Sequence, residues 1–342
     1  MDTASEVSGL SAYDRISAGD PAPPFVLPDR AGTQWSPLDN DVAGKPLLLL
    51  FHASGGGADF TRDVASFAGV KDELDRLGCT VFAVTRGGAE DTAPVPLLTD
   101  ASGDVFRAYD IRSAPGRTVA VLVTPNTKIA YISDGATPPD PRRVLDEIRR
   151  IQNARSAETL GAHPPVLVVP MALSPADCAF LIQLWHRLDE KHGRSGHSEV
   201  DAACVTFLRE YGRVQQYHIE DPRLLEALDA KLARRIMPEI AKAFESQASQ
   251  REGLVISRYD SSEGGMLRPH RDCASEETAH RRFSLTVALN DDYVGGELKF
   301  REYGDQLYRL PTGTAVVFTC ALMHEVLPVT SGSRYALVTH LW

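Results

Sequence analysis

Three residues near the C-terminal end have the types and the spacing of a metal site. His270 and Asp272 flank Arg271, and in an extended strand alternate side chains face the same way, so an imidazole and a carboxylate can bind one ion from one side. His324 is the candidate third ligand, which completes the two-histidine, one-carboxylate set that non-haem iron(II) enzymes use. Further along, Arg334 supplies a planar cation suited to a carboxylate.

Length, composition and net charge indicate the class of protein that carries this site. A chain of 342 residues predicts two domains of ordinary size. With 43% hydrophobic and 24% charged residues it has the composition of a globular protein. The net charge is -10, and the basic residues do not cluster. Because binding of nucleic-acid phosphates needs a clustered basic face, we expect no nucleic-acid partner.

The cysteines and the apolar runs bear on the compartment. Five cysteines, an odd number without a CxxC pair, indicate neither a disulfide framework nor a zinc knuckle and favour a reducing compartment. The first 19 residues have no basic start and no apolar run, and no later stretch is apolar enough to span a membrane. We therefore expect a cytoplasmic protein without a membrane partner.

The first half of the chain alternates strand and helix patterns. The apolar run Pro46–Phe51 predicts a buried strand, and apolar positions spaced by three and four predict a helix over 58–77. Further strands are expected at Thr80–Thr85, Thr118–Thr124 and Ile129–Ser133. This order predicts an α/β layer with mixed strand pairing.

Residues 18–152 resemble the peroxiredoxin branch of the thioredoxin fold. The resemblance rests on four pieces: Gly19-Asp20-Pro21-Ala22-Pro23, Val95-Pro96-Leu97-Leu98-Thr99-Asp100, Tyr109-Asp110-Ile111 and Arg117. Peroxiredoxins carry a Pro-x-x-x-Thr-x-x-Cys segment, but the matching positions here are Ala53, Gly57 and Phe60. A peroxidatic residue must be an exposed thiolate of low pKa. We therefore expect a non-catalytic domain that serves as a scaffold, a docking surface or a lid, with Cys79 as a core residue.

The second half has the pattern of a sheet with helices laid against it. Residues 153–164 are polar and read as a linker, and a helix is expected over 222–244. From residue 254 on, short apolar or alternating runs are separated by Gly, Asp and Pro. Many short strands of this kind predict a double-stranded β-helix, or jelly roll, in residues 165–342, which holds its site in the barrel mouth.

Residues 165–342 resemble a 2-oxoglutarate and Fe(II)-dependent oxygenase of the prolyl 4-hydroxylase type. The matching pieces are Arg258-Tyr259, Pro269-His270-Arg271-Asp272, the run from Arg282 to Asn290, Gly295-Gly296-Glu297-Leu298, Pro311-Thr312-Gly313, Phe318, His324-Glu325-Val326, Pro328-Val329 and Gly332-Ser333-Arg334-Tyr335. All of them stand in the family's order, which makes the pattern specific.

The resemblance implies roles for five residues. His270, Asp272 and His324 would hold Fe(II), Arg334 would bind the far carboxylate of 2-oxoglutarate, and the Tyr259 hydroxyl would add a hydrogen bond to it. Dioxygen would be the second cosubstrate, with ascorbate a candidate reductant. The expected activity is a dioxygenase that hydroxylates an unactivated carbon of an amino acid, a peptidyl residue or a related small metabolite, releasing succinate and CO2.

Several alternatives stay open at this stage. Because Asp272 is retained, hydroxylation, desaturation or ring closure is favoured over halogenation, whose enzymes replace the carboxylate. The alternative to an enzyme is a binding or scaffold protein with both domains degenerate. His340 either faces the cavity or packs beside Trp342. Arg268, Arg281 and Arg282 are candidates for a cationic rim that would favour an acidic substrate, or else are solvated surface residues. The N-terminal domain is a candidate surface for a homodimer or a docking partner.

Overall fold

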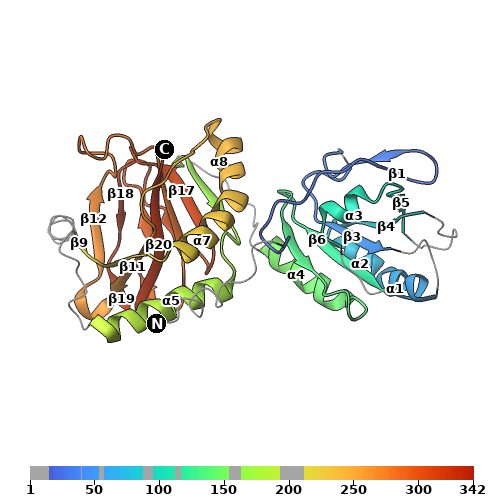
Figure 1. Cartoon of the computed structure of the whole chain (residues 1–342), viewed down its shortest axis with the longest axis horizontal. Coiled ribbons are helices and arrows are strands. Elements are labelled where there is room, and N and C mark those ends of the chain that lie inside the picture. The colour runs from blue at the N-terminus through green and yellow to red at the C-terminus, as the bar shows by residue number, and fades with distance from the viewer. Residues whose placement is uncertain are drawn as a thin grey trace. The chain divides into compact units, whose positions relative to one another are not determined.

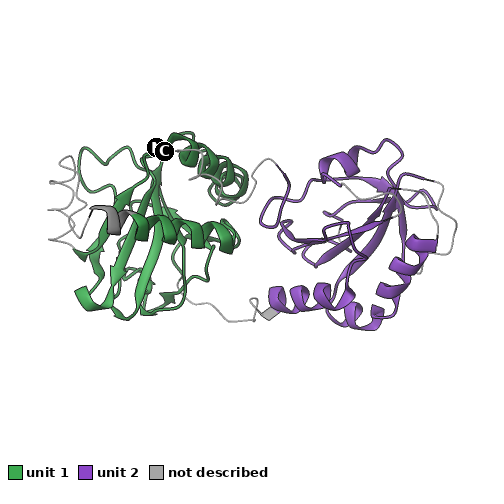
Figure 2. Ribbon diagram, turned by 60° about the horizontal axis from the view of Figure 1, so that its bottom comes forward, with its two compact units in different colours: residues 1–13, 159–342 green, residues 14–158 purple. Residues whose placement is uncertain are grey.

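The computed structural model describes residues 15–39, 41–53, 58–87, 95–111, 117–153, 163–192 and 212–342. The chain divides into two compact units, one within residues 14–158 and one within residues 159–342 (Figure 2). The expected linker over 153–164 lies mostly outside the described residues. No described helix is long and apolar enough to cross a membrane.

The N-terminal unit is built on one mixed sheet of five strands. Their order across the sheet is β5 (Leu97–Thr99), β4 (Thr80–Thr85), β3 (Leu47–His52), β6 (Thr118–Val123) and β7 (Ile129–Ile132). The first three run parallel to one another, β6 pairs antiparallel to β3, and β7 pairs antiparallel to β6. This is the thioredoxin-like α/β layer that the sequence predicts.

Both faces of this sheet are covered, which explains the uninterrupted apolar run in β3. Leu48 and Leu50 pack with helices α1 (Ala58–Ala68), α2 (Lys71–Arg76) and α4 (Pro141–Asn153). Leu47 and Leu49 face the other side, where they pack with α3 (Asp104–Ala108) and the short hairpin of β1 (Leu27–Pro28) and β2 (Gln34–Trp35).

The single helix expected over 58–77 is two helices in the structure. Helix α1 ends at Ala68 and α2 begins at Lys71, with Gly69 and Val70 between them. Glycine costs about 1 kcal/mol in a helix interior relative to alanine, which favours a break at this place.

The C-terminal unit contains two large sheets and a short pair. The six-stranded sheet has the order β10 (Gln215–His218), β11 (Val255–Asp260), β20 (Ser333–Leu341), β13 (Phe283–Ala288), β17 (Ala315–Thr319) and β8 (Val166–Val169). The five-stranded sheet has the order β16 (Leu307–Tyr308), β15 (Leu298–Lys299), β18 (His324–Val326), β12 (Met266–His270) and β9 (Gly212–Arg213). Strands β14 (Val294–Gly295) and β19 (Val329–Ser331) form the pair.

Three helices cover one face of the six-stranded sheet (Figure 1). Helices α5 (Pro175–His192), α7 (Pro222–Arg235) and α8 (Met237–Phe244) bury apolar side chains against that face. A second apolar cluster, which includes Tyr259 and Phe318, draws residues from both sheets. The expected jelly roll with supporting helices is therefore confirmed.

The helix expected over 222–244 is also divided. Ile236 separates α7 from α8, and Pro238 occupies one of the first two positions of α8. Proline has no N–H to donate and its ring crowds the carbonyl four residues earlier, so it starts a new helix here.

Candidate metal centre

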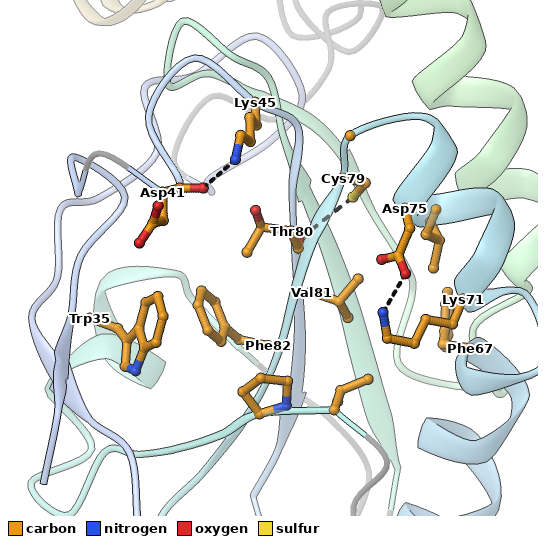
Figure 3. A pocket seen from close by; sticks show the side chains of 14 residues that line it. Trp35, Asp41, Lys45, Phe67, Lys71, Asp75, Cys79, Thr80, Val81 and Phe82 are labelled. Atoms are coloured by element: carbon orange, nitrogen blue, oxygen red, sulfur yellow. Dashed lines mark hydrogen bonds and ion pairs between the residues drawn. The ribbon is translucent and has the colours of Figure 1, made fainter. Parts of the chain in front are cut away.

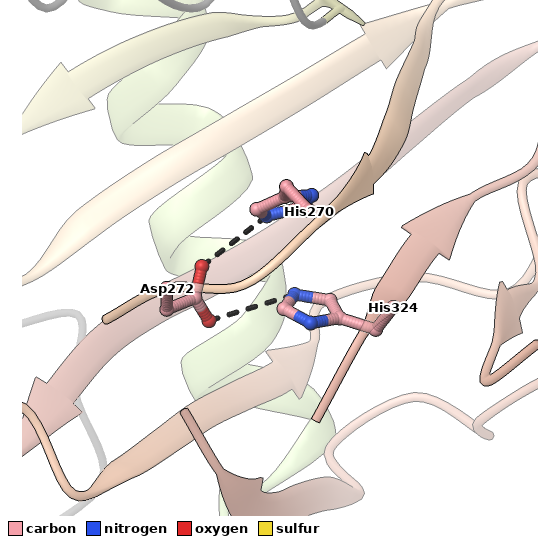
Figure 4. Close-up of side chains that lie close together, drawn as sticks. All are labelled: His270, Asp272 and His324. Atoms are coloured by element: carbon pink, nitrogen blue, oxygen red, sulfur yellow. Dashed lines mark ion pairs between the residues drawn. The ribbon is translucent and has the colours of Figure 1, made fainter. Parts of the chain in front are cut away.

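Three side chains from two neighbouring strands and one turn meet at a single point (Figure 4). The ligand atoms of His270, Asp272 and His324 all lie within 4.8 Å of one another. His270 Nε2 is 3.2 Å from Asp272 Oδ1, and His324 Nε2 is 3.5 Å from Asp272 Oδ2. In the described part of the chain this is the one group of three or more His, Cys, Asp or Glu residues with such geometry.

The two histidines are brought together by strand pairing. His270 ends β12 and is the register partner of His324 at the start of β18, with a register shift between Leu267 and His270. Their ring centroids are 4.3 Å apart. Strand pairing therefore joins residues that lie far apart in the sequence.

Asp272 reaches the same point by a route that differs from the expectation. The sequence predicts His270 and Asp272 on one extended strand, but β12 ends at His270 and Asp272 lies in the turn that follows. The Asp272 backbone N–H donates to the Cys320 carbonyl at 3.1 Å, which holds the turn. Arg271 points away as expected, toward Glu302 and the Ala321 carbonyl.

Backbone carbonyls fix the orientation of both imidazole rings. His270 Nδ1 lies 2.8 Å from the Arg268 carbonyl, and His324 Nδ1 lies 3.0 Å from the Leu322 carbonyl. Because a carbonyl only accepts, each Nδ1 carries the hydrogen and each Nε2 keeps its lone pair for a metal. Two imidazoles and one carboxylate on one side are the donor set suited to iron(II).

The charges in this group are arranged for metal binding. Burial acts to raise the pKa of Asp272, but the neighbouring His324 and hydrogen bonds from His270 and His340 outweigh it and hold the pKa well below 3.8. Burial lowers the pKa of His324, which favours the neutral ring. Burial also acts to lower the pKa of His270, yet its hydrogen bond with Asp272 raises that pKa, so a metal and a proton compete there.

Arg334 and Tyr259 lie side by side in the six-stranded sheet. They are register partners on β11 and β20, and the Arg334 guanidinium carbon lies 4.9 Å from the centre of the Tyr259 ring. Arg334 is only 6% exposed, and among the described residues no carboxylate lies within ion-pair distance of it. A buried cation without such a partner is costly unless an anionic ligand is bound.

Gly296 makes room for this arginine. Its φ is +69°, a conformation that residues with a Cβ rarely adopt, and a Cβ there would lie 3.1 Å from Arg334 Cδ. The expected glycine turn therefore leaves the space that the arginine side chain occupies.

Three more side chains contact the metal ligand Asp272, and Glu252 joins two of them. His340, left open from the sequence, faces the site, with Nε2 3.5 Å from Asp272 Oδ2. The Ser284 hydroxyl donates to the same oxygen. Arg281, a candidate for a cationic rim, instead binds Glu252 and the Asp272 carbonyl. No sequence pattern points to Glu252 or Ser284, because their partners lie on other strands.

The N-terminal unit has no reactive group at the position where peroxiredoxins carry their cysteine. Phe60 is buried in α1 and its ring centroid is 5.0 Å from that of His52, at the end of β3. Cys79 is buried just before β4, and burial raises the pKa of its thiol to about 12. It lies in the wall of a pocket of about 430 Å³ with Lys45 and Lys71, at the other end of the strands from His52 (Figure 3).

Comparison with known proteins supports both halves of this description. Residues 254–342 match the family model of the 2OG-Fe(II) oxygenase superfamily, and residues 18–132 match that of the AhpC/TSA family. A PKHD-type hydroxylase of Xanthomonas axonopodis pv. citri is 31% identical over 184 residues, which cover 50% of this chain and 75% of that protein. This chain belongs to the 2OG-Fe(II) oxygenase superfamily.

Two further proteins are similar to parts of this chain. A PKHD-type hydroxylase of Synechococcus is 32% identical over 135 residues, so the match covers 37% of this chain and 55% of that protein's length. The crystal structure of a Pseudomonas putida prolyl-4-hydroxylase is similar over 52% of this chain and 92% of its own, with 18% identity and a TM-score of 0.39. Both resemblances expected from the sequence, to the oxygenase and to the peroxiredoxin fold, are confirmed by the two family models.

Proposed function

We propose that this protein is a 2-oxoglutarate-dependent dioxygenase that hydroxylates an unactivated carbon of an amino acid, a peptidyl residue or a related small metabolite. The observation that carries the proposal is the convergence of two imidazoles and one carboxylate, in the same unit as a buried arginine that stacks on a tyrosine ring. Membership of the oxygenase superfamily supports the same reading.

His270, Asp272 and His324 are the proposed ligands of Fe(II). Their Nε2 and carboxylate atoms converge, and the bonds from the two Nδ1 atoms to backbone carbonyls keep the rings turned toward the metal. The bound iron supplies the chemistry by which dioxygen and 2-oxoglutarate yield succinate, CO2 and a hydroxylated substrate.

Arg334 and Tyr259 are the proposed cosubstrate anchors. A guanidinium forms two parallel hydrogen bonds to a carboxylate, and burial makes such a charge-assisted pair stronger than it is in water. The arginine stacks on Tyr259, and the absence of a Cβ at Gly296 leaves room for it. In this proposal the pair binds the far carboxylate of 2-oxoglutarate.

The first test is spectroscopic. Protein reconstituted without oxygen, with Fe(II) and 2-oxoglutarate, should show a weak visible charge-transfer band that His270→Ala abolishes. A mass-spectrometric screen of amino acids and peptides for a gain of one oxygen, with succinate measured in parallel and with ascorbate present or absent, then identifies the substrate. Absence of the band in the parent protein would contradict the proposal.

We further propose that the N-terminal unit is a non-catalytic scaffold or docking surface in a cytoplasmic protein. Phe60 occupies the nucleophile position, and the four cysteines in the described residues are free thiols. Peroxide consumption by the parent protein should equal that of Cys79→Ser and of buffer. Thiol-dependent consumption that Cys79→Ser removes would show that the unit is a peroxidase.

A further inference from the structure

Glu252 is fixed beside the last strand of the sheet, close to the metal ligands but not among them. A β-bridge joins its neighbour Arg251 to Leu341. The Glu252 N–H donates to the His340 carbonyl at 2.9 Å, and Thr339 Oγ1 donates to the Glu252 carbonyl at 3.0 Å. The backbone of Glu252 is therefore hydrogen-bonded to the end of β20 through both its N–H and its carbonyl.

The Glu252 carboxylate has cationic or ring N–H partners at both oxygens. Arg281 binds it through two bonds of 2.6 and 2.7 Å, from Nε and Nη2. His340 Nδ1 lies 3.2 Å from Oε2, and His280 Nε2 lies 3.3 Å from Oε1. Burial opposes ionisation, but the His340 and Arg281 hydrogen bonds outweigh it and lower the pKa of Glu252 to about 2. A charged carboxylate thus lies against Arg281, His340 and His280.

Two of these partners continue to Asp272. His340 Nε2 lies 3.5 Å from Asp272 Oδ2, so the ring spans two carboxylates, and Arg281 Nη1 donates to the Asp272 main-chain carbonyl at 3.0 Å. Ser284, opposite His340 in the β13–β20 register, donates its hydroxyl to the same Oδ2. Asp272 is therefore held at its carboxylate and at its backbone by residues linked to Glu252.

The contacts of the two carboxylate oxygens differ. Oδ2 of Asp272 faces Ser284, His340 and His324, whereas Oδ1 faces His270 at 3.2 Å. His340 itself does not belong to the group whose ligand atoms lie within 4.8 Å of one another. This separates it from the ligands and makes it a spacer between Glu252 and Asp272.

We propose that Glu252 is a positioning residue that acts through His340 and Arg281 to hold Asp272, so that Oδ1 is presented to the metal while Oδ2 is retained by the protein. The inference rests on the proposed function, because it takes Asp272 as a metal ligand.

The test measures metal binding rather than turnover. Metal-free full-length parent, Glu252→Gln, His340→Phe and the double variant are titrated with Mn(II) by calorimetry. Each single variant should bind about 10- to 100-fold more weakly, the usual loss when an outer partner of a ligand is removed. The double variant should lose no more than the worse single one, because both changes break one connection. His163→Phe, on an exposed histidine near Tyr308, is the matched control and should bind like the parent.

The outcomes separate this inference from the proposed function. If the parent binds Mn(II) and both single variants bind equally well, the inference is wrong and the proposed metal site stands. If the parent binds no metal, both fall together. Affinity for 2-oxoglutarate at saturating Mn(II) should stay at the parent value, and a matching loss there would assign the effect to general damage. Should His340→Phe fail to fold, Glu252→Gln, which keeps the side-chain shape, decides alone.

Discussion

Two buried histidines, one in each unit, have different surroundings. His52 is 2% exposed and His324 is 6% exposed, and burial lowers the pKa of both. His52 Nδ1 lies 3.3 Å from the Thr118 hydroxyl and its ring packs on Phe60. His324 directs Nε2 toward Asp272, beside a second imidazole.

The contrast shows that burial of a polar ring does not by itself make a reactive site. At the end of β3 the neighbouring position is an apolar ring, so the thioredoxin-like unit keeps its fold without a nucleophile. At the end of β12 three ligand atoms with lone pairs converge, which is costly in a fold that has no metal to bind them. The convergence of buried ligand atoms, and not the burial of a histidine alone, therefore indicates a functional site.

The largest expected effect is on the converging group itself. Asp272→Ala removes its only anionic ligand, so affinity for Mn(II) should fall more than about 100-fold, beyond the range for an outer partner, and turnover should vanish. Calorimetry and succinate release measure this. Asp146→Ala, an exposed aspartate on α4, is the control. Unchanged metal binding in Asp272→Ala would show that Asp272 is not a metal ligand.

A substitution in the N-terminal unit should lower stability without changing metal binding. Phe60→Ala leaves a cavity beside His52, and truncation of a buried phenylalanine typically costs about 3–5 kcal/mol of unfolding free energy. Denaturant unfolding followed by circular dichroism should show that loss, while Mn(II) affinity stays at the parent value. A parallel loss of metal affinity would mean that the two units are coupled.

A smaller effect is expected at the cosubstrate anchor. Arg334→Lys keeps the charge but loses the bidentate geometry, and a hydrogen bond to a charged group contributes about 1.5–3 kcal/mol, or roughly 10- to 150-fold in the KM for 2-oxoglutarate. Metal affinity without cosubstrate should not change. Arg150→Lys, on the exposed face of α4, controls for the substitution type. An unchanged KM would remove Arg334 from the anchor role.

The smallest effect is a pH dependence. The pKa of Glu252 is lowered from 4.5 to about 2, so the folded state binds this proton less readily than the unfolded state. The stability that Glu252 contributes is present above pH 4.5 and is lost as pH falls toward 2. Thermal unfolding of Glu252→Gln should show a shallower decline than the parent over that window. Identical acid profiles would show that Glu252 contributes nothing there.

Much of the site could be predicted because its residues stand in a fixed order along the chain. The sequence predicts His270, Asp272 and His324 as one group, and their ligand atoms lie within 4.8 Å of one another in the structure. It also predicts a glycine turn, which the structure places against Arg334. The geometry that brings them together was predicted less well, since Asp272 lies in a turn and not on a strand. A turn held by a distant carbonyl leaves no periodic pattern in the sequence.

The sequence by itself determined the two fold classes, because the apolar run of β3 and the short apolar or alternating runs of the late strands can each be recognised from neighbouring residues. It also determined which nucleophile is absent and which metal donors are present. Only the tertiary structure decided that His340 faces Asp272, that Arg281 binds Glu252 and that Ser284 lies opposite His340. These contacts follow from the antiparallel register of β13 and β20 and from the chain beside them, and register is set by packing between strands that are distant in the sequence.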